Sequence, residues 1–460
     1  MPKASRPVLY RHAAIQSLPS DSFAHDALAF SLLEAGTKLR PGAAIAIQGS
    51  WGRGKTDVLA RIAQLTESQR TRVPRVARPV LWINPWQYST ADLLTPLVVQ
   101  LLSEMPGSKS PDRAQWRQAA KTVLRAGFSF GLKAASITVP GGSLLDTARE
   151  PVDALLENLF DAEANPRKVI PDDADPVAVM GVRFSELIDA SITAANRSGA
   201  DRIVVCVDDL DRCLPERQIA MLEALHFLLS AGARCIFYVG IDEGLVAASA
   251  RVHYQSDTFD ADLYLDKMFD LRVSLPGLTP EDISMQIEGY LAQGNRGEVL
   301  EEWIPKGELT RLTSGIFAAR RLRNPRVIRR ILDRMYILAA SGEKLEQLGR
   351  HAGFNRFRAV MAWMAISECW PRIRAYLQQR STNPSAFKDV TESLIGWLRP
   401  ATKSDLMTNA NILSHPGALQ ALPPDEERAD LRSILSAVQE LDPTFGFALG
   451  LDRMLHNCGI

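Results

Sequence analysis

The sequence lacks the residue patterns that mark disulfide-rich, zinc-binding and strongly basic proteins. Its five cysteines are odd in number, scattered and never spaced as C-x-x-C, which predicts reduced thiols in a cytoplasmic protein. Its seven histidines form no H-E-x-x-H motif and no Cys/His cluster, so we expect no zinc site. The 53 basic residues balance 53 acidic ones, so the chain has no overall positive charge of the kind typical of nucleic-acid-binding proteins.

Long apolar runs are also scarce. The most apolar stretch, residues 123–139, is interrupted by Arg125 and Lys133, whereas a membrane-spanning helix needs about 20 mostly apolar residues. No secretory signal peptide is visible either. We therefore expect a protein with no membrane span, and an interfacial role for residues 123–139 is the alternative.

What the sequence does contain is a phosphate-binding motif. Residues 49–56 (GSWGRGKT) match the phosphate-loop pattern G-x-x-x-x-G-K-[ST] at every fixed position. Glycines let successive backbone N–H groups turn toward a phosphate, and the following helix directs its positive N-terminal end to the same charge. In this motif the lysine reaches the β- and γ-phosphates and the hydroxyl binds Mg²⁺. We expect nucleotide contacts from Gly49, Trp51, Gly52, Arg53, Gly54, Lys55, Thr56 and Asp57.

The surroundings of the motif favour a genuine phosphate loop over a chance match. An apolar strand is predicted at residues 43–48, directly before the loop. After the loop, Val58, Leu59, Ile62 and Leu65 recur at helical spacing. Strand, glycine loop and amphipathic helix follow one another in the order that the mechanism requires.

A second motif, residues 203–209 (IVVCVDD), is an apolar strand that ends in two acids, which is a Walker B pattern. Ligands gather at the carboxyl ends of parallel strands, so Asp208 is placed to hold Mg²⁺ through water and Asp209 to orient or deprotonate the attacking water. A helix-capping or loop role for both acids is the alternative. Many ATPases have glutamate at position 209, and Asp211 could share its role. We therefore expect hydrolysis to be slow or partner-dependent.

Other polar residues follow the same predicted sheet edge. Arg212 is a candidate arginine finger, in cis or toward a neighbouring subunit, and a salt bridge to Asp209 or Asp211 has equal weight. Asn84 is a candidate for positioning water. Trp51 and Trp86 are interpreted as packing residues. We interpret Asp242 as the cap of the helix that follows the fourth strand.

Apolar runs and helical periodicities alternate along the first 276 residues. The expected strands are residues 43–48, 79–84, 202–207, 235–240 and 270–273. Strands that alternate with helices predict an α/β fold, in which a parallel sheet has helices on both faces. Beyond residue 276 we expect only helices, near residues 280–292, 325–338, 354–366, 386–398 and 429–441.

Together these motifs resemble the KAP family of P-loop NTPases. The resemblance is carried, in the family's order, by residues 49–56, 83–88 (INPWQY), 207–213 (VDDLDRC), 264–269 (YLDKMF) and 324–330 (NPRVIRR). It implies an ASCE-type core, in which another strand lies between those of the two Walker motifs. It also implies ATP with Mg²⁺, nucleotide-driven assembly or switching, and an association of soluble bacterial members with anti-phage defence, including Qat-type systems. Many family members carry transmembrane helices between the Walker motifs, where this chain has only residues 123–139.

From these observations we expect three domains. Residues 1–276 would form the P-loop NTPase core, with a helical insertion at about 105–200. Residues 277–345 would form a helical lid. Residues 346–460 would form a C-terminal helical domain, for which a partner-docking or effector role is our hypothesis because no motif there names a ligand.

An arginine-rich helix is predicted to start at Asn324 and Pro325, with an N-cap and a proline at the first helical position. Three interpretations stay open. In the first, Arg326 swings onto the γ-phosphate as a sensor residue. In the second, the arginines bind nucleic-acid phosphates without sequence preference. In the third, they form a solvated face with salt bridges to Asp333 and the acidic insertion.

The leading hypothesis is a Mg²⁺-dependent ATPase that acts as a switch, with operon-encoded protein partners and a possible homo-oligomer. One alternative is a nucleotide-binding scaffold with little turnover, which the aspartate at position 209 favours. The other is a nucleic-acid-stimulated ATPase.

Overall fold

The computed structural model describes residues 25–67, 76–87, 199–230, 233–255, 259–300, 322–342 and 356–380, with parts of residues 184–193 and 389–458. The chain divides into two compact units, Met1–Leu275 and Pro276–Ile460. Most of the predicted insertion at residues 105–200 and the apolar stretch at residues 123–139 lie outside the described residues. Within the described residues, no helix combines the length and apolarity needed to cross a membrane.

The first unit is built around five strands: β1 (Ala43–Gln48), β2 (Val76–Ile83), β3 (Arg202–Val207), β4 (Cys235–Ile241) and β5 (Leu271–Ser274). Neighbouring strands are parallel throughout, and their order across the sheet is β2-β3-β4-β1-β5. Every residue of β1, β3 and β4 is buried, as expected for strands covered on both faces. The predicted parallel α/β fold is confirmed, and β4 lies between β1 and β3, which carry the two Walker motifs.

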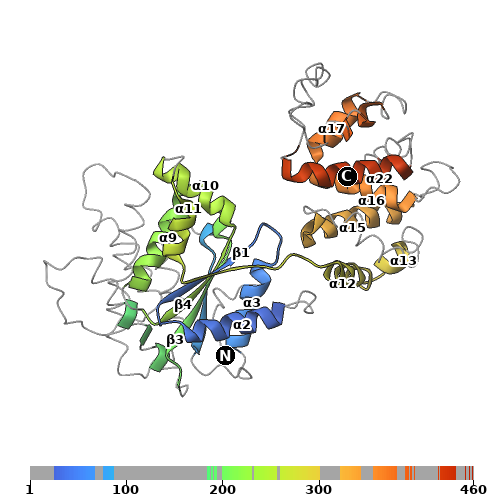
Figure 1. The fold of residues 1–460 in the computed structure, drawn as a ribbon. Helices are drawn as coiled ribbons and strands as arrows, with labels where there is room; N and C mark the ends of the chain where they lie inside the picture. The colour runs from blue at the N-terminus through green and yellow to red at the C-terminus, as the bar shows by residue number, and fades with distance from the viewer. Residues whose placement is uncertain are drawn as a thin grey trace, which may run out of the picture. The chain divides into compact units, whose positions relative to one another are not determined.

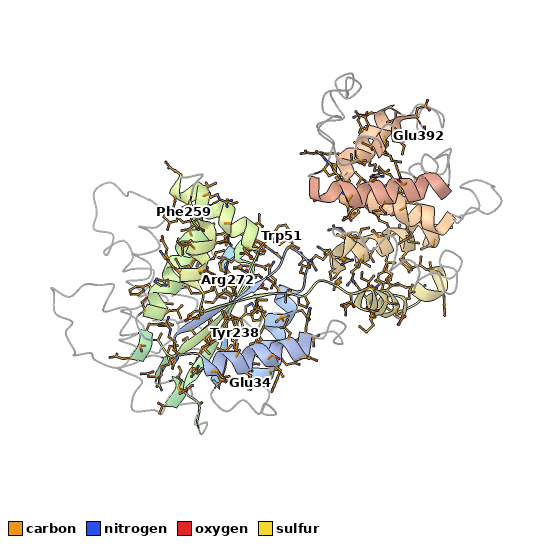
Figure 2. The ribbon with its side chains drawn as sticks, in the orientation of Figure 1. Glu34, Trp51, Tyr238, Phe259, Arg272 and Glu392 are labelled. Carbon is orange, nitrogen blue, oxygen red and sulfur yellow. The ribbon has the colours of Figure 1, made fainter. Side chains whose placement is uncertain are left out.

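Helices cover both faces of this sheet (Figure 1). On one face α2 (His25–Lys38) and α3 (Lys55–Glu67) form a buried cluster with the strands, which includes Leu32, Val58 and Ile62. On the other face lie α9 (Pro215–Ser230), α10 (Glu243–Tyr254) and α11 (Ala261–Met268). The side chains of both helical layers reach toward the sheet (Figure 2). The expectation of helices on both faces is therefore confirmed.

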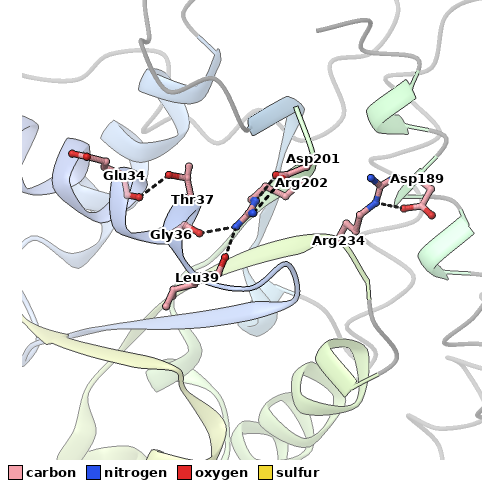
Figure 3. Close-up of polar contacts among 8 residues, drawn as sticks. All are labelled: Glu34, Gly36, Thr37, Leu39, Asp189, Asp201, Arg202 and Arg234. Carbon is pink, nitrogen blue, oxygen red and sulfur yellow. Dashed lines mark hydrogen bonds and ion pairs between the residues drawn. The ribbon is translucent and has the colours of Figure 1, made fainter. Parts of the chain in front are cut away.

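Two buried polar side chains tie α2 to the sheet. Arg202, the first residue of β3, is almost fully buried and donates hydrogen bonds to the carbonyl oxygens of Gly36 and Leu39 at 2.9 and 3.0 Å (Figure 3). A cation at the C-terminal end of a helix offsets the partial negative charge of the unpaired carbonyls there. Tyr238 of β4 donates its hydroxyl to the carbonyl of Leu32 at 3.0 Å. These contacts fix α2 beside the strands that carry the predicted site.

The second unit is helical throughout its described residues. Its longer helices are α12 (Pro280–Leu291), α15 (Pro325–Ala340), α16 (Arg356–Cys369), α17 (Pro371–Arg380) and α22 (Asp425–Leu441), and a short helix, α13 (Arg296–Leu300), lies between α12 and α15. Thr279 begins α12 with a capping box. The Thr279 hydroxyl accepts a hydrogen bond from the backbone N–H of Asp282, and the Asp282 carboxylate accepts one from the backbone N–H of Thr279. Trp370 Nε1 donates to Glu427 at 3.0 Å and joins the end of α16 to α22.

Most predicted elements occur within two or three residues of their expected bounds. Strands β1 and β3 match residues 43–48 and 202–207, whereas β2 begins three residues earlier than expected, at Val76. Helices α11, α13 and α17 were not predicted. Two of them are only eight and five residues long, too short to establish a helical apolar period. Of the predicted helix at residues 386–398, the structure describes residues 389–392, 394, 395 and 398, and all of these except residue 398 are helical.

Candidate functional site

The residues singled out in the sequence meet at one edge of the sheet. Because β1, β2, β3 and β4 are parallel, their carboxyl ends lie on the same side. The glycine loop follows β1, Asn84 follows β2, Asp208 and Asp209 follow β3, and Asp242 follows β4. This edge is where open parallel sheets bind their ligands.

The glycine loop has the backbone conformation of an anion cradle. Gly52 and Gly54 have backbone φ angles of 84° and 100°, which residues other than glycine rarely adopt. The N–H of Arg53 donates to the carbonyl of Ser50 at 3.3 Å, and α3 begins at Lys55, directly after the loop. A Cβ added to Gly54 would lie 2.6 Å from Cε1 of His25. Position 54 therefore requires glycine both for its backbone and for the space that His25 occupies.

His25 belongs to a polar network behind the loop that the sequence did not reveal. It is buried at the first residue of α2, and its Nδ1 lies 2.6 Å from Oδ2 of Asp57. Arg61, one turn further along α3, donates to the same oxygen at 3.0 Å and also contacts Asp26. Burial alone would raise the pKa of Asp57, but the hydrogen bonds from His25 and Arg61 outweigh it and lower that pKa. The Asp57 side chain thus anchors the first turn of α3.

Lys55 is buried, and its ammonium lies among three oxygen atoms. Its Nζ donates to the carbonyl of Gly49 at 2.7 Å and lies 3.5 Å from the carbonyl oxygen of Ser50. It also lies 3.0 Å from Oδ2 of Asp211, an ion pair whose alignment is not that of a hydrogen bond. Both side chains are less than a tenth exposed. Asp211, expected to share the role of Asp209, is therefore the partner of the loop lysine.

Asp208 lies next to Lys55. A Cβ added to Gly240 of β4 would be 3.4 Å from Oδ1 of Asp208 and 3.5 Å from Cβ of Lys55, so both side chains border the same glycine. The sequence separates these two residues by more than 150 positions, and the sheet brings them together. Gly240 was missed in the sequence because a glycine at the end of a strand gives no signal of what it faces.

The oxygen donors at this edge suit Mg²⁺. The carboxylate of Asp208 and the hydroxyl of Thr56, at the second residue of α3, are the ligand types that this ion prefers. In the part of the chain that the structure describes, no three His, Cys, Asp or Glu side chains gather as a metal cluster. A Mg²⁺ ion held here would need water and phosphate oxygens to complete its shell, as is usual for nucleotide-bound Mg²⁺.

Asp209 is held in an unusual conformation by two partners. Its φ of 57° places it in the left-handed region, and it begins the short turn η2 (Leu210–Arg212). Asn84 Nδ2 donates to one carboxylate oxygen at 2.9 Å, and Arg212 Nε lies 2.7 Å from the other. Arg212 also lies over the ring of Trp86, 5.6 Å from its centroid. The structure thus contains the salt bridge that was one of the two interpretations of Arg212, and the arginine-finger role stays a prediction.

Three further expectations have clear outcomes. Asp242 is the N-cap of α10 and accepts a hydrogen bond from the N–H of Leu245, which confirms the capping interpretation. The interpretation of Trp51 and Trp86 as packing residues is corrected, because 52% and 46% of their surfaces are exposed. Trp51 extends from the loop after β1 (Figure 2). Both rings therefore lie partly in solvent at this edge of the sheet, and the Trp86 ring faces Arg212.

The arginine helix α15 belongs to the second unit. Asn324 caps it by accepting from the N–H of Arg326, as predicted. Arg330 and Arg334 both pair with Glu368 of α16, and Arg329 lies 3.8 Å from Asp333. The salt-bridge interpretation therefore holds for these three arginines, with Glu368 and Asp333 as the partners among the described residues. Arg326 is exposed, and its contact with the γ-phosphate stays a prediction.

Comparison with known proteins agrees with the geometry of this site. The model of the KAP family P-loop domain matches residues 26–341, which is more than half of the chain. The matched range includes all five strands, the glycine loop, the acids after β3 and α15. A comparison with the curated proteins gave no match.

Proposed function

Because the chain belongs to the KAP family of P-loop NTPases, we propose that it is a Mg²⁺-dependent ATPase that acts as a conformational or assembly switch. One observation carries this proposal. A glycine loop with two left-handed glycines ends in Lys55, and Lys55 and Asp208 border the same glycine of β4. A phosphate cradle beside a carboxylate is the arrangement that binding of a Mg²⁺-nucleotide requires.

The proposed roles follow from position. The loop N–H groups and the Lys55 ammonium bind the phosphates, with Gly49, Trp51, Gly52, Arg53, Gly54 and Asp57 around them. Thr56 and Asp208 hold Mg²⁺, which supplies positive charge to the phosphate oxygens. Asp209 orients the attacking water, and Asn84 holds Asp209 in place. Catalysis then consists of positioning and charge stabilisation, without a covalent intermediate.

Arg212 and Arg326 supply positive charge for the transition state in this proposal. Arg212 is already at the edge of the sheet, where it neutralises Asp209. To act as an arginine finger, the Arg212 guanidinium would have to leave the Asp209 carboxylate and contact the γ-phosphate. Arg326 has no ion pair among the described residues and is exposed, so its guanidinium is available to a phosphate. Movement of the helical lid that carries Arg326 would transmit the state of the nucleotide.

A nucleotide-binding scaffold with little turnover is the second candidate. Both carboxylate oxygens of Asp209 are engaged, one by Asn84 and one by Arg212. A carboxylate bound in this way has fewer lone pairs left to accept a hydrogen bond from the attacking water. Aspartate is also one methylene shorter than the glutamate that many ATPases have here. A nucleic-acid-stimulated ATPase is less favoured, because Glu368 neutralises positive charge on Arg330 and Arg334.

The test measures nucleotide binding and phosphate release separately. We expect the wild type to bind ATP and release phosphate, Asp209→Asn to bind ATP and release phosphate at least a hundredfold more slowly, and Lys55→Ala to lose binding. Lys38→Ala is the matched control, because Lys38 is an exposed lysine whose one ion-pair partner in the described part of the chain is Glu34 on its own helix. Binding without measurable turnover in the wild type would establish the scaffold. Absence of binding would overturn both candidates.

The cellular role is proposed at a coarser level. The five free cysteines support a reducing, cytoplasmic location. A part in anti-phage defence, with operon-encoded partners and possible homo-oligomers, comes from the family resemblance. A plaque assay that compares the wild type with Lys55→Ala, each expressed with the neighbouring genes, tests this role. Equal plaque numbers with and without the wild-type genes would exclude defence against the phages used.

A further inference from the structure

The ion pair between Lys55 and Asp211 has no place in the roles proposed above. Asp211 is neither the Walker B acid, which is Asp208, nor the acid after it, which is Asp209. Its side chain is only 2% exposed, and its carboxylate lies 3.0 Å from the ammonium of the phosphate-loop lysine. Together with the carbonyls of Gly49 and Ser50, it surrounds that ammonium with three oxygen atoms.

An ammonium has three N–H donors, and a nucleotide phosphate needs at least one of those of Lys55. The carbonyls of Gly49 and Ser50 belong to the loop that also cradles the phosphate, and they remain beside the lysine whenever the loop keeps its shape. The Asp211 carboxylate carries the same sign of charge as a phosphate. Two anions that share one buried cation repel each other strongly in a medium of low dielectric constant.

The turn that carries Asp211 connects the partner of Lys55 to Arg212 and to α9. It starts at Asp209 in the left-handed region, and its backbone is held by N–H bonds from Arg212 to Asp209 and from Cys213 to Leu210, at 3.2 and 3.1 Å. Arg212 of the same turn pairs with Asp209 and lies over Trp86. The turn leads directly into α9 through Leu214, which is 68% exposed. A shift of Asp211 would therefore move Arg212 and the start of α9.

We propose that Asp211 is the resident counter-ion of Lys55, which a nucleotide phosphate displaces, so that nucleotide binding releases the turn at residues 210–212. This inference rests on the proposed nucleotide binding and adds how that binding is sensed. Asp211 weakens nucleotide affinity, because the phosphate must compete with it for the ammonium. In return it places a negative charge 3.0 Å from a buried cation, and removing one partner of a buried ion pair is costly.

Asp211→Asn separates these two effects, because asparagine keeps the shape and removes the charge. The expected result is a Kd for MgADP at least tenfold lower than that of the wild type, together with a lower melting temperature in the absence of nucleotide. Asp209→Asn is the matched control. This variant removes the Asp209 carboxylate, which precedes the same turn and pairs with Asn84 and Arg212 instead of Lys55. We expect its Kd for MgADP to differ from that of the wild type by less than threefold.

The outcomes are distinguishable. If the wild type binds no MgADP, the proposed function fails. If the wild type binds MgADP and Asp211→Asn leaves the Kd within twofold or raises it, the counter-ion role is overturned, and a raised Kd would assign Asp211 to the nucleotide site itself. Should Asp211→Asn not fold, hydrogen exchange on the wild type decides. Added MgADP should speed exchange of the Arg212 and Cys213 amides, and unchanged or slower exchange would overturn release of the turn.

Discussion

Asn84 Nδ2 donates a hydrogen bond of 2.9 Å to Oδ2 of Asp209, and this bond joins residues that follow the neighbouring parallel strands β2 and β3. Asn84 is buried, with 3% of its surface exposed. The backbone of Asp209 is in a conformation that aspartate adopts at some cost in free energy. The bond therefore helps to hold the candidate catalytic acid in one orientation.

Asn84→Ala is expected to lower the rate of phosphate release by about tenfold to a hundredfold, because the Asp209 carboxylate loses one of its two fixed partners. The Kd for ATP should stay within threefold, since Asn84 is not among the proposed phosphate contacts. Single-turnover kinetics and a binding titration measure the two quantities. A higher rate in the variant would show instead that Asn84 holds Asp209 away from its working position.

Gly240→Ala tests the junction between Lys55 and Asp208. The new methyl group would lie 3.3 Å from Leu59, which would have to give way by a few tenths of an ångström, and would fill the space beside Asp208 and Lys55 at 3.4 and 3.5 Å. We expect the affinity for Mg²⁺-nucleotide to fall about tenfold, with the secondary structure unchanged. Gly289→Ala is the control, since a Cβ there meets nothing within 4 Å. That variant should keep the wild-type affinity and gain up to about 1 kcal/mol of helix stability.

Gly36→Ala tests the docking of α2 on the sheet. A Cβ at position 36 would lie 2.2 Å from the hydroxyl oxygen of Tyr238, which donates to Leu32 one turn earlier. We expect a loss of roughly 1–3 kcal/mol in the free energy of unfolding, measured by urea denaturation. In a Tyr238→Phe background the same change should cost less, because the clashing oxygen is gone. Equal costs in the two backgrounds would place the strain elsewhere.

The pH dependence of stability should report on Asp57. Hydrogen bonds from His25 and Arg61 lower its pKa in the folded protein, so its contribution to stability is fully present above the ordinary value of 3.8. It is lost as the pH falls through the lowered pKa. We therefore expect Asp57→Asn to be less stable than the wild type at pH 7 in the absence of nucleotide, and the difference to shrink below pH 3.8.

Denaturant midpoints measured at several pH values check this expectation. Asp262→Asn is a suitable control, because the Asp262 side chain is 80% exposed and its one ion pair among the described residues is a 3.8 Å contact with Arg272. Its stability relative to the wild type should not vary between pH 3 and 7. A difference for Asp57→Asn that stays constant across this range would contradict a lowered pKa for Asp57.

Local patterns were enough to predict much of the core. Residues 43–47 and residues 203–207 are apolar without interruption, which is the signature of strands buried on both faces, and the strands at residues 43–48 and 202–207 were located correctly. The N-cap at Asn324 followed by proline predicted the start of α15 correctly, because capping depends on a few adjacent residues. Short helices such as α11 escaped prediction, since eight residues give too few turns for a period.

The sequence alone determined that a phosphate loop lies between a buried strand and a helix, and that two acids end a second buried strand, because these features depend on neighbours in the chain. Tertiary structure alone decided which side chains meet. Only the order of the strands places Asp208 and Lys55 against Gly240, pairs Asp211 with the loop lysine and sets His25 behind Gly54. Contacts between residues that are distant in the chain depend on the order in which the strands pair in the sheet. That order is determined by residues spread over the whole core.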